Sequence, residues 1–81
     1  YRTALTRGEL SAQERQGLSL ATRREMEVLS LIARGATNGE IAREMVIADT
    51  TVKTHVSSLL SKLAARDRVA LVLLAQKAGI A

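Results

Sequence analysis

Apolar residues recur three or four positions apart in several stretches of the chain, a spacing that gives a helix one apolar face. These stretches are about Arg23 to Arg34, a short one from Asn38, about Asp49 to Leu63, and about Arg68 to Ala78. Ser11, followed three residues later by Glu14, allows a further short helix that Gly17 would end. The pattern predicts an all-α fold: a four-helix bundle with a short N-terminal helix added.

The predicted helices begin at residues that can cap them. Thr22 with Glu25, and Thr37 with Glu40, form pairs in which the threonine caps the helix and the glutamate reaches back to its amide. Further boundary signals are Asp67 at the start of the last helix and Gly35 and Gly79 at helix ends.

The two central helices are as close together as a helix-turn-helix requires. Ile41, Ala42 and Met45 give the shorter helix one apolar face, and residues 46–49 then break the helical pattern. Asp49 places a carboxylate at the positive end of the following helix. A short helix, a tight turn and a longer helix in this order predict a unit that enters the major groove of DNA.

The longer helix has two different sides. Its apolar stripe consists of Val52, Val56, Leu59, Leu60 and Leu63, and the opposite side carries Thr50, Lys53, Thr54, Ser57 and Ser61. Short hydroxyls and one lysine, with no acid beyond the first turn, favour close approach to a polyanion. An ordinary solvated helix face is the alternative interpretation of this side.

Residues 21 to 80 resemble the DNA-binding domain of the LuxR/FixJ type, the helix-turn-helix effector of many bacterial transcription regulators. The blocks that carry the resemblance are residues 22–29, 35–42, 51–55, 62–63 and 66–68. The chain departs from the family pattern at Ala21, where Leu is usual, at Ala64, where Gly is usual, and at Ala70-Leu71, where Gln-Ala is common. Ala48 replaces the usual Ser cap, so we expect Asp49 to act as the cap or as a partner of the helix dipole.

The outer face of the longer helix supplies the candidate DNA contacts. Lys53 can pair with guanine acceptors and the methyl group of Thr54 can touch a thymine methyl, and the resemblance implies base contacts at both positions. The predicted base-contacting residues are Lys53, Thr54, Ser57 and Thr50, and the predicted phosphate-contacting residues are Thr37, Asn38, Thr51, His55, Ser58 and Lys62.

The last helix is apolar on almost all sides. Val69, Val72 and Leu73 can face the core, which leaves a second stripe of Leu71, Leu74, Ala75 and Ala78. This second stripe predicts a homodimer contact. Pairing there would set two recognition helices about one turn of DNA apart on an inverted repeat.

The amino-acid composition limits the classes of function that the protein can have. The net charge of +4 favours a polyanionic partner, and with Tyr1 as the single aromatic residue the chain has no platform for stacking single-stranded bases. One His and no Cys cannot build a metal site or a catalytic triad, so we expect no enzyme activity, metal or cofactor. The lack of Cys, of a long apolar run and of a signal peptide predicts a cytoplasmic protein that does not enter a membrane, and the resemblance implies a bacterial one.

The expected organisation is a linker or N-terminal extension over residues 1–19 and a DNA-binding domain over residues 20–81. The linker would connect to a receiver or sensor domain of a two-component response regulator, and a short stand-alone regulator is the alternative. Double-stranded DNA is the expected partner, with RNA polymerase as a further candidate. Two other functions stay open: a sigma-factor-like region that binds promoter DNA and RNA polymerase, and a protein-interaction module that does not touch DNA.

Overall fold

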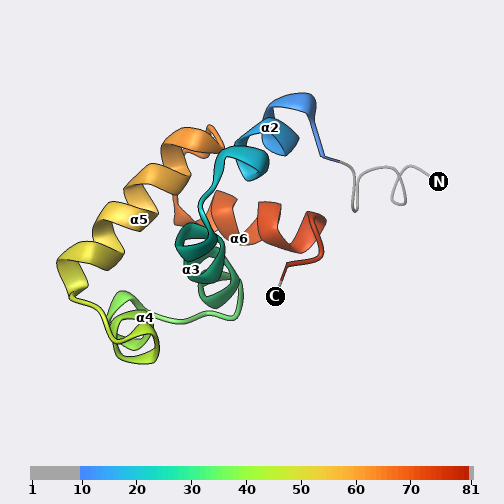
Figure 1. Ribbon diagram of the computed structural model, residues 1–81. Helices are drawn as coiled ribbons and strands as arrows, with labels where there is room; N and C mark the ends of the chain where they lie inside the picture. Colours follow the sequence, from blue (N-terminus) through green and yellow to red (C-terminus); the bar gives the residue numbers. More distant parts are fainter. Residues whose placement is uncertain (1–9, 81) are drawn as a thin grey trace.

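The computed structural model describes residues 10–80, which form helices and no strands (Figure 1). The helices are α2 (Ala12–Leu20), α3 (Arg23–Ala33), α4 (Asn38–Met45), α5 (Asp49–Lys62) and α6 (Arg68–Lys77). The prediction of an all-α fold with a helix-turn-helix is confirmed. Of the predicted linker, residues 1–9 lie outside the described residues, and residues 12–19 belong to α2.

The first three helices begin with the same arrangement of side chains. In each, a hydroxyl accepts from the backbone amide three residues on, and a glutamate accepts from the backbone amide of the capping residue. A cap of this kind stabilises a helix by about 1 kcal/mol. At α5 the capping residue Ala48 makes no side-chain hydrogen bond, so Asp49 does not cap the helix and stands in its first turn as a partner of the dipole. The pairs are Ser11 with Glu14, Thr22 with Glu25, and Thr37 with Glu40.

Two helices end at residues that hold an uncommon backbone conformation. Val46 after α4 and Ala64 after α5 have positive φ angles of 57° and 54°. Left-handed backbone costs an L-residue about 1–2 kcal/mol, and a β-branched residue such as Val46 rarely adopts it. Ala64 keeps the left-handed turn although the family usually has glycine there.

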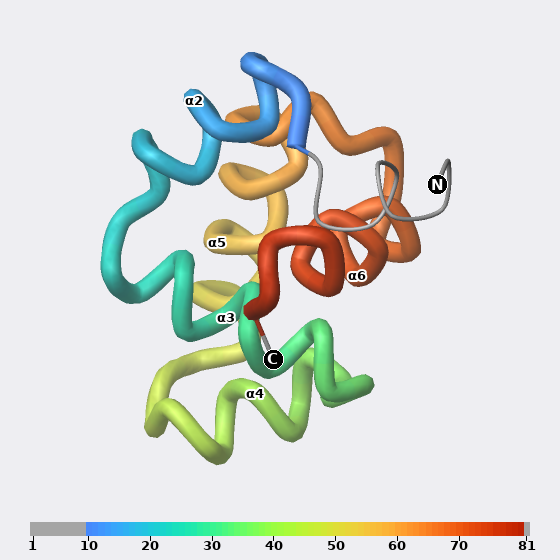
Figure 2. Tube along the Cα trace, turned by 90° about the vertical axis from the view of Figure 1, so that its right-hand side faces the viewer, coloured from blue at the N-terminus to red at the C-terminus, as the bar shows by residue number. Residues whose placement is uncertain are grey.

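The core lies where α3 packs against α5 and α6, and α4 packs against α5. Figure 2 shows α3 and α6 in front of α5, with α4 crossing below them. The side chains with less than 2% exposure are Leu29, Ile32, Ile41, Leu59, Leu71, Val28 and Val52. The apolar stripes of α3, α4 and α5 supply this core together with Leu71 of α6.

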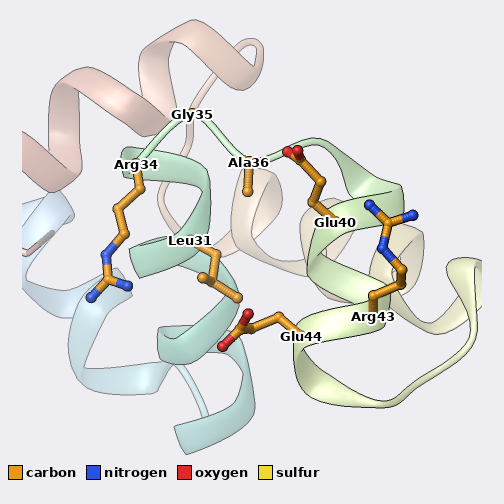
Figure 3. Close-up of a pocket in the computed structure, with 7 residues that line it drawn as sticks. All are labelled: Leu31, Arg34, Gly35, Ala36, Glu40, Arg43 and Glu44. Atoms are coloured by element: carbon orange, nitrogen blue, oxygen red, sulfur yellow. The ribbon is translucent and has the colours of Figure 1, made fainter.

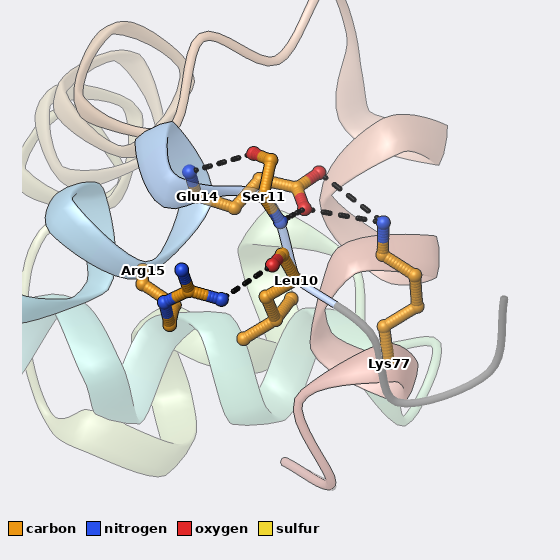
Figure 4. Close-up of polar contacts among 5 residues, drawn as sticks. All are labelled: Leu10, Ser11, Glu14, Arg15 and Lys77. Carbon is orange, nitrogen blue, oxygen red and sulfur yellow. Dashed lines mark hydrogen bonds and ion pairs between the residues drawn. The ribbon is translucent and has the colours of Figure 1, made fainter. Parts of the chain in front are cut away.

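Helix α2 is docked on the end of the bundle. Gly17 does not end the helix as predicted, because α2 continues to Leu20. A Cβ at position 17 would collide with the backbone carbonyl of Lys62, so the glycine is what lets α2 lie against the end of α5. Lys77 on α6 also reaches Glu14, with Nζ 3.1 Å from Oε1 (Figure 4).

The two faces of α6 were predicted the wrong way round. Leu71 and Ala75 are fully buried and Leu74 is 4% exposed, whereas Val69 is 66% and Leu73 is 56% exposed. The predicted homodimer contact through Leu71, Leu74, Ala75 and Ala78 is therefore wrong, because the first three of these residues fill the protomer's own core and Ala78 is half-buried. The two stripes have similar spacing, so periodicity alone could not tell them apart.

Candidate nucleic-acid interface

Helix α5 lies along one side of the molecule, with the other described helices packed against its inner side (Figure 1). Thr50, Lys53, Thr54 and Ser57 recur at intervals of three, one and three residues and are all exposed. We call these four residues the outer row of α5. Their spacing puts the side chains on one helix face, and the structure leaves that face open.

The side chains of the outer row are short apart from the lysine. The hydroxyl of Thr54 donates to the carbonyl of Thr50 at 3.0 Å, which satisfies its proton inside the helix. The methyl group and the oxygen lone pairs of Thr54 are left for a ligand. Lys53 is the positively charged residue of the outer row, and its side chain is exposed on the same face.

Helix α4 presents its N-terminus through Thr37 and Asn38. The hydroxyl of Thr37 accepts from the amide of Glu40 at 3.2 Å, and its own hydroxyl hydrogen can still donate. Asn38 is half-buried, and its Oδ1 accepts a 2.7 Å hydrogen bond from the guanidinium of Arg68. The sequence alone leaves Arg68 undecided, since an arginine beside a turn can bind phosphate or face solvent.

The remaining predicted phosphate contacts divide into two pairs. Thr51 is exposed and His55 is half-buried. Lys62 instead turns toward α3, where its ammonium lies 2.7 Å from Oε1 of Glu25 and donates to the carbonyl of Leu20 at 3.2 Å. Ser58, one turn before Lys62, faces the same carboxylate. The phosphate contacts of Ser58 and Lys62 stay predictions, although the Lys62 ammonium already pairs with a carboxylate of this chain.

Glu25 is a buried carboxylate, 5% exposed, at the start of α3. Burial raises its pKa, but hydrogen bonds from Lys62, Ser58 and the Thr22 backbone outweigh that effect and lower the pKa to about 2. The carboxylate stays ionised and serves as an internal anchor for the C-terminal end of α5.

An open hollow of about 590 Å³ lies between the end of α3 and helix α4 (Figure 3). The charged residues around it are Arg34, Glu40, Arg43 and Glu44, so the hollow is lined by equal numbers of positive and negative side chains.

Within residues 10–80, no group of three or more His, Cys, Asp or Glu side chains is placed to hold a metal ion. No helix in that range is long and apolar enough to cross a membrane.

The sequence that forms α4, the turn at Val46 and α5 lies within a match to a known family. Residues 19–75 match the family described as bacterial regulatory proteins, luxR family. The chain belongs to this family. Together with the helix-turn-helix, membership makes the chain a DNA-binding domain of a bacterial transcription regulator.

Individual relatives are regulators of greater length. The chain is 55% identical over 47 residues to the transcriptional regulatory protein LiaR of Bacillus subtilis, covering 58% of this chain and 22% of the relative. It is 54% identical over 56 residues to the response regulator protein VraR of Staphylococcus aureus, covering 69% of this chain and 27% of the relative. The chain thus spans about a quarter of the length of these relatives.

Proposed function

We propose that this luxR-family domain contacts base edges with the outer row of α5 lying in the major groove of duplex DNA. The observation that carries the proposal is that Thr50, Lys53, Thr54 and Ser57 share one open face of a helix whose opposite face is anchored in the core. Lys53 would donate to guanine O6 and N7, and the methyl of Thr54 would contact a thymine methyl.

Phosphate contacts would come from both sides of the groove. Thr37 and Asn38 at the start of α4 offer a hydroxyl, a side-chain amide and backbone amides that have no partner within the helix. Thr51 and His55 flank the outer row on α5. Ser58, one turn further along α5, would add a contact, whereas Lys62 is left out of this proposal because its ammonium pairs with Glu25.

We propose further that the domain pairs on an inverted repeat through the exposed side of α6. Val69 and Leu73 are 66% and 56% exposed, and Gln76 follows on the same face. A strip this small would give a weak dimer in solution that forms mainly when two copies occupy adjacent half-sites.

The whole protein would be a cytoplasmic response regulator with a receiver domain preceding α2. The names of the relatives and the small share of their length that this chain covers support that proposal. RNA polymerase would be a partner of the whole protein rather than of this domain alone.

An electrophoretic mobility shift with a random-sequence duplex tests DNA binding by the 81-residue chain. We expect a shift at about 50 mM salt that weakens steeply toward about 200 mM, because phosphate contacts release counterions. Absence of any shift at low salt would overturn the proposal in favour of a protein-interaction module. Binding to core RNA polymerase without DNA would favour the sigma-factor-like alternative.

A further inference from the structure

Arg68 joins the start of α6 to the start of α4. Its Nη1 donates to Oδ1 of Asn38 at 2.7 Å, and its Nη2 donates to the backbone carbonyl of Ala36 at 2.6 Å. Both hydrogen bonds are partly buried and short, as expected when the donor carries a charge. One guanidinium therefore fixes both the loop before α4 and the first side chain of that helix.

The contact determines which way the Asn38 amide faces. A guanidinium has only donors, so the atom of Asn38 that faces Arg68 must be the carbonyl oxygen. The amide nitrogen of Asn38 is left with its hydrogens, and it donates to none of the residues that the structure describes. Without Arg68 the amide could rotate and present its oxygen, which would repel a phosphate.

We propose that Arg68 is a positioning residue for DNA binding, which orients Asn38 so that the amide nitrogen donates to a DNA phosphate. The proposal rests on the proposed function, because it needs a phosphate at the N-terminus of α4. Arg68 acts through Asn38 and does not itself neutralise a phosphate.

The chemistry of this position requires arginine. The two acceptors, Oδ1 of Asn38 and the Ala36 carbonyl, are met by two different nitrogens of the same planar fork. A lysine brings the same charge on a single nitrogen without the planar fork, so it cannot meet these two acceptors with two separate nitrogens. Arg68→Lys thus keeps the net charge and removes the orienting contact.

The test is a double-mutant cycle on a duplex selected by this chain from a random library, with Arg68→Lys, Asn38→Ala and the double variant. We expect each single variant to bind about tenfold more weakly, the double variant to bind like Asn38→Ala alone, and the salt slope to stay unchanged. Arg66→Lys, on the exposed turn just before α6, is the charge-matched control and should bind like the unmodified chain. Unchanged binding by Arg68→Lys, or an equal loss in the Asn38→Ala background, would overturn the proposal.

A second variant decides the matter even if Arg68→Lys fails to fold. Asn38→Asp keeps an oxygen for Arg68 and replaces the outward amide nitrogen with a carboxylate oxygen. We expect it to melt no lower than the unmodified chain and to bind the duplex more weakly than Asn38→Ala does. Binding equal to or tighter than that of Asn38→Ala would contradict the proposed orientation. If the unmodified chain bound no duplex at all, the proposed function would fail instead.

Discussion

Lys62 at the end of α5 lies with its Nζ 2.7 Å from Oε1 of Glu25 at the start of α3. The same ammonium donates to the carbonyl of Leu20 at the end of α2. Because Glu25 also completes the cap at Thr22, one ion pair joins three helix ends. The C-terminal end of α5 is thereby fixed to the scaffold, while its outer row stays open.

The Glu25 carboxylate should make the fold sensitive to acid. Its pKa is lowered from 4.5 to about 2 in the fold, so its contribution is fully present above about pH 4.5 and is lost as the pH falls toward 2. The shift corresponds to about 3 kcal/mol of the free energy of unfolding. Urea unfolding at a series of pH values from 7 to 2 measures this loss.

A matched pair of variants isolates that carboxylate. Glu25→Gln should lower the free energy of unfolding at pH 7 and remove this part of its dependence on acid, whereas Glu44→Gln, at an exposed position on α4, should change neither. An acid response that survives unchanged in Glu25→Gln would show that other groups cause it.

Glycine at position 64 should stabilise the domain. Ala64 holds a φ of 54°, a conformation in which its Cβ clashes with the backbone and glycine has no such clash. The strain energy that glycine removes from the folded state exceeds the conformational entropy that it adds to the unfolded chain. We expect Ala64→Gly to raise the free energy of unfolding by about 0.5–1 kcal/mol. Thermal or urea unfolding checks this, with Ala65→Gly as the neighbouring control that should destabilise. A loss of stability in Ala64→Gly would contradict the left-handed assignment.

Adjacent leucines on α6 should respond in opposite ways to the same substitution. Leu74→Asp buries a carboxylate in the core and should unfold the domain, because Leu74 is 4% exposed. Leu73→Asp, at a position that is 56% exposed, should leave the fold intact and abolish cooperative filling of the two halves of an inverted repeat. Circular dichroism and a titration with the repeat measure the two effects. Cooperative binding by a folded Leu73→Asp variant would remove this face as the dimer contact.

Helix ends can be predicted from the sequence because their causes are local. The pair of Thr37 and Glu40 lies within one turn, so these two residues are enough to place the start of α4 at Asn38. The row at Thr50, Lys53, Thr54 and Ser57 is predictable for the same reason, since four residues of one helix share a face by spacing alone.

Contacts between distant helices cannot be predicted this way. The Lys62 side chain is of a type that commonly binds phosphate. Only the packing of α3 against α5 shows that its ammonium forms an ion pair with Glu25. The orientation of α6 depends likewise on its packing against α3, which buries Leu71 and Ala75 and leaves Arg68 on the same helix side at the α3–α4 loop. The exposed Gln76, on the face of Val69 and Leu73, is the sequence signal that marks the outer side.

The most direct test of α5 as the base-contacting helix is a random-library duplex selection with the unmodified chain and with Lys53→Ala. We predict that Lys53→Ala loses the preference for one base pair in each half-site and binds the original site more weakly by about 1–3 kcal/mol. Arg43→Ala, which removes a positive charge from the exposed side of α4, should keep the original preference. If Lys53→Ala selects the same sequence with the same stringency as the unmodified chain, the outer row of α5 does not contact the bases.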